Sequence, residues 1–105
     1  MPGPEFENLL LEAVDQGLSV LGESSKLSIY FHLEKSFGIK RQDIPQKTDA
    51  FVSAVEKLFG PGAKCIETLV SKGLCEKAGL NIEEDAIKNL SFVETVALVK
   101  KTMER

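Results

Sequence analysis

The stretch TDAFVSAVEKLFGPGAKCIETLVSKGLCEKAG, residues 48–79, decides the fold class of this chain. Before Gly60, apolar residues recur at every third or fourth position, as they do along one face of a helix. Gly60 suits a helix end, and Pro61 suits the first turn of a following helix. A second run with the same spacing extends to Gly79. The stretch therefore predicts two helices joined by a short turn.

The helical spacing continues towards the N-terminus. Residues 5–22 predict a first helix, and residues 24–38 predict a second helix with Ser24 or Ser25 as its N-cap. Apolar side chains cover more than half of the circumference of this second helix. We therefore expect the second helix to lie at the centre of the molecule.

Residues 39–45 interrupt the helical spacing. Proline disfavours helical backbone at the residue before it, so Pro45 predicts a non-helical Ile44. We expect a connector here, with Ile39 and Ile44 pointing inward. Thr48 or Asp49 is the expected N-cap of the helix that follows.

Two capping-box patterns predict helix starts near the C-terminus. In a capping box, the first side chain and a Glu three residues later each bond the backbone N–H of the other. Asn81 and Glu84 fit this pattern before a short helix that extends to Leu90. Ser91 and Glu94 fit it at the start of a last helix.

Apolar and polar residues nowhere alternate as they do in a half-buried strand, and Gly and Pro fall where helix ends are needed. The predicted fold class is all-α, a compact bundle of five to six short helices. With 105 residues, the chain is expected to form a single helical domain over residues 5–105. Residues 1–4, Met-Pro-Gly-Pro, are expected to be a flexible N-terminus or a cloning remnant.

Composition limits the classes of partner. The chain carries 13 basic and 16 acidic side chains, a net charge of −3, so neither nucleic acid nor an anionic membrane is the expected partner. No window is apolar over the length of a membrane span, and no signal peptide precedes the first helix, so the expected location is cytoplasmic.

The cysteines and the histidine argue against metal and cofactor chemistry. Cys65 and Cys75 fall on one predicted helix, too far apart for a disulfide, and are expected to be buried and inert. With one histidine and no CxxC spacing, we expect no metal and no cofactor. No nucleophile motif or Gly-rich phosphate loop occurs, so an enzyme is not expected.

His32 carries the sharpest chemical hypothesis. It lies on the polar strip of the second helix with Lys35 one turn later, and this H-x-x-K spacing looks like the centre of histidine phosphotransfer domains. Those domains usually have a glycine after the lysine, where this chain has Ser36. The alternative is an ordinary surface histidine, which is the commoner role of a single exposed imidazole.

A third hypothesis is DNA binding. The two helices around Gly60-Pro61-Gly62 have the outline of a helix-turn-helix. The second of them carries Lys64, Lys72 and Lys77, but no Arg, Asn or Gln that could contact a base edge in two places. DNA binding is therefore the weakest of the three functions.

Protein interaction is the function that the pattern favours most. Val93 and Ala97 flank the main apolar stripe of the last helix, and Leu11 breaks the pattern of the first. These residues are the expected contact surface for a partner or for a second copy in a homodimer. A charge at Leu11 or Val93 should abolish self-association without loss of helix, whereas unfolding would assign the residue to the core.

A wider resemblance supports this expectation. Residues 18–80, with motifs such as YFHLEK at 30–35, FGIKR at 37–41 and FGPGAK at 59–64, look like a small archaeal helical domain family of uncharacterised function, of the Nitrosopumilus output-domain type. The resemblance implies work beside two-component signalling proteins and brings no catalytic residue. The expected function is a non-enzymatic interaction or signalling output module.

Overall fold

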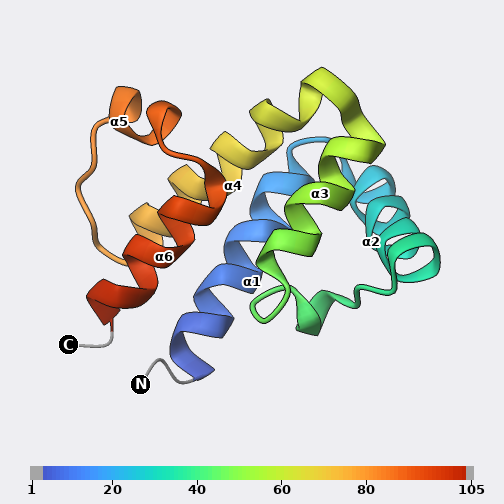
Figure 1. Ribbon diagram of the computed structural model, residues 1–105, viewed down its shortest axis with the longest axis horizontal. Coiled ribbons are helices and arrows are strands. Elements are labelled where there is room, and N and C mark those ends of the chain that lie inside the picture. The colour runs from blue at the N-terminus through green and yellow to red at the C-terminus, as the bar shows by residue number, and fades with distance from the viewer. Residues whose placement is uncertain (1–3, 104–105) are drawn as a thin grey trace.

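The computed structural model describes residues 4–103, which form six α-helices and two single-turn 3₁₀ helices. In chain order the elements are α1 (Pro4–Ser19), α2 (Glu23–Phe37), η1 (Arg41–Asp43), α3 (Thr48–Phe59), η2 (Gly60–Gly62), α4 (Ala63–Lys77), α5 (Glu84–Asn89) and α6 (Phe92–Met103). No strand occurs between residues 4 and 103, so the all-α bundle of short helices is confirmed (Figure 1). Residues 1–3 of the expected flexible terminus lie outside the described residues, and Pro4 already begins α1.

The centre of the molecule is the pair α1 and α4, which cross at very short range. A Cβ atom added to Gly17 of α1 would lie 2.7 Å from Cγ2 of Val70 on α4. One turn away along each helix, Ala13 of α1 faces Gly73 of α4. Small residues on both helices therefore let the two backbones approach.

The other helices cover this pair. Helices α3 and α6 pack on α4 and meet each other through the rings of Phe51 and Phe92, whose centroids are 5.8 Å apart. Helix α5 packs against α4, and α2 lies at the opposite end of the molecule (Figure 1). One cluster of buried apolar residues joins the elements; its fully enclosed members include Leu10, Val14, Leu18, Leu33, Ile44, Val55, Leu74 and Val99.

The expectation of a central α2 is wrong. Only Ile29 and Leu33 of this helix are buried, and α2 packs against α1 and α3 at the edge of the bundle. Its N-cap is Gly22 rather than Ser24 or Ser25, and both serines are exposed in the first turn. A wide apolar circumference shows that a helix has several apolar sides, but not that each side has a neighbour.

The connector after α2 follows the prediction in its side chains but not in its backbone. Gly38 ends α2 in the left-handed conformation, with φ 68°, which glycine adopts without strain. Ile39 and Ile44 are both buried, as expected. Ile44 is nevertheless helical, with φ −54° and ψ −45°, because it closes the single turn of η1. Helical backbone at the residue before a proline costs only a modest free energy, and burial of the Ile44 side chain offsets that cost.

One of the two capping boxes forms. Ser91 Oγ accepts a bond of 3.0 Å from the Glu94 backbone, and Glu94 Oε1 accepts one of 2.9 Å from the Ser91 backbone. The box at Asn81 is wrong, because α5 begins only at Glu84, with an extended Glu83 as its N-cap. Thr48 is likewise the first residue of α3 rather than its N-cap, which is Lys47.

The two cysteines lie on α4, as the spacing predicted, but they differ in exposure. Cys75 is buried, and burial raises the pKa of its thiol. Cys65 is exposed, which corrects the expectation that both are enclosed. Ten residues at about 100° each place the two side chains about 80° apart around the helix, so that only one faces the core.

Candidate functional site

The most exposed apolar helix face in the molecule belongs to α2. Leu27 is 64% exposed and Phe31 is 57% exposed, although both lie in the middle of a regular helix. They are one turn apart and stand opposite Ile29 and Leu33, the two buried residues of the helix. Helix α2 therefore has one apolar side in the core and another in solvent.

Helix α2 is held in place by a polar tie around Asp15 of α1. The guanidinium of Arg41 donates two hydrogen bonds to the Asp15 carboxylate, of 3.0 and 2.6 Å, and the Tyr30 hydroxyl of α2 donates a third. Burial acts to raise the pKa of Asp15, but the bonds from Arg41 and Tyr30 outweigh it and hold that pKa below its usual value. Burial and the same carboxylate raise the pKa of Tyr30. The tie joins α1, α2 and η1.

Beside this exposed face lies a hollow of about 550 Å³ between α2 and the end of α3. Its lining residues are Leu21, Ser24, Ser25, Ser28, Ile29, His32, Leu58 and Phe59. The lining combines four apolar side chains with three serine hydroxyls and one imidazole. We call Leu27, Phe31, Lys35 and the residues that line this hollow the α2 surface.

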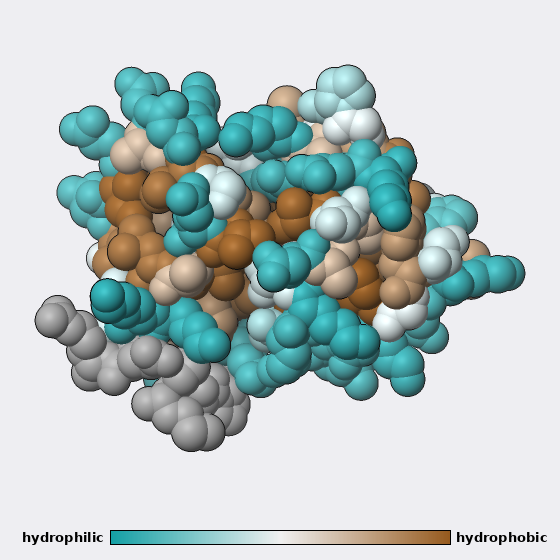
Figure 2. All heavy atoms as spheres, in the orientation of Figure 1, coloured by the Kyte–Doolittle hydropathy of each residue, from teal (hydrophilic) through white to brown (hydrophobic). Residues whose placement is uncertain are grey.

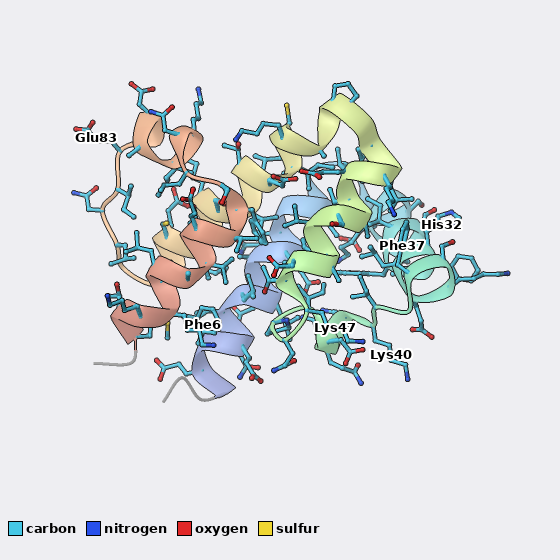
Figure 3. The ribbon with its side chains drawn as sticks, in the orientation of Figure 1. Phe6, His32, Phe37, Lys40, Lys47 and Glu83 are labelled. Carbon is cyan, nitrogen blue, oxygen red and sulfur yellow. The ribbon has the colours of Figure 1, made fainter. Side chains whose placement is uncertain are left out.

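The structure places His32 and Lys35 on the α2 surface, but it does not join them. His32 is exposed on the outer end of the molecule, far from Phe6 and Glu83 (Figure 3). Its ring meets the Phe31 ring edge-on, with centroids 5.5 Å apart. The Lys35 ammonium lies 5.4 Å from the centre of the same Phe31 ring. Phe31, rather than the imidazole, is thus the contact of this cation among the described residues.

The charges on α2 are divided between its two flanks. At about 100° per residue, Glu34 lies roughly 150° around the helix from the middle of the hollow, and Glu23 lies on the same side as Glu34. Lys35 lies between Phe31 and the hollow. Among the described residues, no acidic side chain lines the hollow. The hollow is therefore lined by apolar, hydroxyl and imidazole groups, whereas Glu23 and Glu34 lie next to Leu27 and Phe31 on the outer edge of the α2 surface.

The residues expected to form a contact surface on α6 line a second hollow. Val93 is partly buried and Ala97 is exposed, and both border a space of about 460 Å³ between α6 and the start of α3. Figure 2 shows hydrophobic residues gathered at the end of the molecule where Figure 1 places α5 and α6. Leu11 is different, because it is partly buried and packs against the core.

Helix α4 contributes one buried acid. Glu67 is 9% exposed, and its Oε2 atom has no hydrogen-bond partner among the residues that the structure describes. Burial, together with the charge of Glu56 on α3, raises the pKa of Glu67. Glu67 does not line the hollow beside α2, so this buried carboxyl lies outside the α2 surface.

Sequence reasoning identified His32 and Lys35 but missed Leu27, Phe31 and the hollow. The available signal was the apolar circumference of α2, which was assigned to the core. Among residues 4–103, no group of three or more His, Cys, Asp or Glu side chains is arranged to hold a metal ion. None of the helices described is long and apolar enough to cross a membrane. No family model, no curated protein and no solved structure matches the chain.

Proposed function

We propose that this chain is a non-enzymatic module that binds another protein through the α2 surface. The observation that carries the proposal is the exposure of Leu27 and Phe31 in the middle of a regular helix. Both stand beside a hollow that no side chain of the described residues fills. Large apolar side chains that gather around a concavity are typical of docking sites for other proteins.

The partner class follows from the resemblance of residues 18–80 to output domains. That resemblance favours a two-component signalling protein as the partner. The exposed Ala97 and the half-buried Val93 on α6 remain a second contact surface, for a further partner or for a second copy of the chain.

A photo-crosslinking experiment in the native cells tests the proposal. A benzophenone side chain in place of Phe31 should give one discrete adduct, and Leu27→Ser should remove that adduct. The same benzophenone at Gln42, an exposed residue of η1, should give none. Adducts of equal yield at both positions, or none at position 31, would remove the α2 surface as the docking site.

Histidine phosphotransfer is the second candidate, and the exposure of His32 beside a hollow favours it. In such a transfer an imidazole nitrogen attacks phosphorus, and the previous phosphorus bond breaks. The contact of Lys35 with Phe31 counts against it, because the cation would have to leave that ring to reach a phosphoryl group.

Exposure to phosphoramidate separates the two functions. Transfer of its phosphoryl group to His32 would release ammonia and would add one phosphoryl group to the mass of the protein. The adduct should be absent in His32→Ala and shorter-lived in Lys35→Ala if phosphotransfer is the function. Interaction without phosphotransfer predicts an unmodified His32 with the crosslink intact.

A further inference from the structure

We infer that the hollow beside α2 binds a neutral small molecule that has an apolar body and hydrogen-bonding groups along one edge. The hollow lies at the α2 end of the molecule, where Figure 3 shows His32. At about 100° per residue, Leu27 and Phe31 lie roughly 110° around the helix from the middle of the hollow. The inference goes beyond the proposed function, because a molecule in the hollow leaves this pair available to contact a protein.

The groups that line the hollow come from different parts of the chain. The polar ones all belong to α2 and are the side chains of Ser24, Ser25, Ser28 and His32. Three of the four apolar ones lie outside this helix, and they are Leu21, Leu58 and Phe59. A molecule in the hollow therefore meets hydrogen-bonding groups along α2, and apolar side chains mainly from the turn before α2 and the end of α3.

The polar groups along α2 form a line that is available to a ligand. Ser24, Ser28 and His32 follow each other at intervals of four residues, so they lie along one side of the helix over about 12 Å. All three are exposed, and none has a side-chain hydrogen bond to another residue that the structure describes. A ligand can therefore gain these bonds without breaking any within the protein.

The groups around the hollow also determine the charge of the ligand. A serine hydroxyl and a neutral imidazole both donate and accept hydrogen bonds without carrying a charge. Among the described residues, no carboxylate, ammonium or guanidinium group lines the hollow, and Lys35 lies over the Phe31 ring instead. A charged ligand would therefore lose hydration without gaining an ion-pair partner. A neutral ligand avoids this cost, and the net charge of −3 neither attracts nor repels it.

The volume of the hollow suits a small molecule. At about 550 Å³ it falls within the range of about 300–1,000 Å³ that is typical of small-molecule sites. Such sites combine apolar side chains with a few polar groups that fix the orientation of the ligand. Because most of the lining residues are exposed, a bound molecule keeps part of its surface in water. A two-ring compound is therefore expected to bind with a Kd of about 0.1–1 mM.

Three naphthalene compounds, each with one substituent at the same ring position, provide the test. Naphthamide, naphthoate and naphthylmethylamine share the apolar rings and are neutral, anionic and cationic, respectively. Binding to the full chain is followed by amide NMR at mildly alkaline pH, where imidazole groups are neutral. We expect naphthamide to shift the amide signals of Ser28, His32 and Leu58, and to bind about fivefold more tightly than either charged compound.

A matched pair of serine variants assigns the hydrogen bonds to the hollow. Ser28→Ala removes one hydroxyl from the lining and should weaken the binding of naphthamide about fivefold. Ser53→Ala removes another exposed hydroxyl, on α3 and outside the hollow, and should leave the affinity unchanged. Circular dichroism of both variants verifies folding. If Ser28→Ala binds naphthamide as tightly as the wild type does, the hydrogen-bonding edge of the ligand is wrong.

Other outcomes overturn the inference in distinguishable ways. If naphthoate or naphthylmethylamine binds most tightly, the hollow is a site for an ion and not for a neutral molecule. If the three compounds bind equally, or if none shifts the signals of the lining residues, the hollow does not select a neutral ligand. The crosslink at position 31 tests protein docking separately, so its result does not depend on these outcomes. Preference for naphthamide that Ser28→Ala reduces supports the inference.

Discussion

The close crossing of α1 and α4 predicts that one substitution has opposite effects at two glycines. Alanine in place of a helical glycine stabilises the helix by about 1 kcal/mol when the new methyl group has room. At Gly73 the added Cβ would lie 3.9 Å from Cβ of Ala13 and 4.0 Å from Oε1 of Gln16, which are ordinary contacts. Gly73→Ala is therefore expected to raise the free energy of unfolding by about 0.5–1 kcal/mol.

At Gly17 the added Cβ would lie 2.7 Å from Cγ2 of Val70 and 3.4 Å from its backbone nitrogen. Carbon atoms pack best at about 3.5–4.0 Å, so the first contact is nearly 1 Å too short. Val70 is fully buried, and a β-branched residue in a helix has one strongly preferred rotamer, so it cannot swing aside. Overpacking of this kind costs about 1–3 kcal/mol, which outweighs the gain in helix propensity. Gly17→Ala is expected to destabilise the protein by about 1 kcal/mol.

Urea unfolding followed by circular dichroism measures both variants against the wild type, and thermal midpoints should move by about 5 °C in opposite directions. A double variant with Val70→Ala provides the control, because removal of Cγ2 relieves the contact. The double variant should be more stable than the sum of the two single effects. If Gly17→Ala stabilises the protein as much as Gly73→Ala does, the two backbones do not cross as closely as described.

Three further predictions concern single side chains. Asp15→Asn should lower the free energy of unfolding by about 1 kcal/mol at pH 7, because it weakens the bonds from Arg41. The pKa of Asp15 is lower in the folded state than in the unfolded state, so the wild type should lose this advantage in stability as pH falls through the folded pKa. If the difference between the urea midpoints of wild type and variant stays constant at acidic pH, the tie around Asp15 does not contribute as described. Glu67→Gln should stabilise the protein by about 1 kcal/mol at neutral pH. The raised folded pKa makes the wild type lose stability as pH rises from the unfolded value through the folded one, and a pH titration of unfolding should show no such loss in the variant. Ser91→Ala should cost about 1 kcal/mol by removing the acceptor for the Glu94 backbone, and an unchanged thermal midpoint would show that the box contributes nothing.

The sequence was sufficient to predict the helices because their signals are local. Apolar spacing of three and four residues marks each long helix, and Gly38 ends α2 as expected. Pro61 was expected in the first turn of α4, but it lies in the single turn η2 that precedes this helix. The pair Ser91 and Glu94 was identified for the same reason, since both partners of the box lie within one turn. Such features depend on neighbours in the chain rather than on the arrangement of the bundle.

The arrangement of the bundle could not be predicted in the same way. Nothing in the residues around Gly17 shows that Val70 will lie against it, because that contact joins two helices far apart in the chain. The tie of Tyr30 and Arg41 to Asp15 is equally non-local. Spacing reports which side of a helix is apolar, and only packing decides whether that side is covered.

The candidate site shows this limit most clearly. His32 and Lys35 were identified by residue type, and both lie on the α2 surface. Leu27 and Phe31 belong to the wide apolar circumference that predicted a central second helix, because apolar residues on a helix are usually buried. The structure leaves both of them in solvent, and this exposure is what favours binding over an internal role for α2.

The pairing of α1 with α4 also determines when the chain can complete its fold. During synthesis α1 leaves the ribosome before α4, its principal partner, which follows only after α2, η1, α3 and η2 have been made. Until then the apolar side of α1 has no permanent cover, and non-local pairings of this kind slow folding. A cleavage anywhere between the two helices separates the halves of the core, so neither fragment is expected to keep its structure alone.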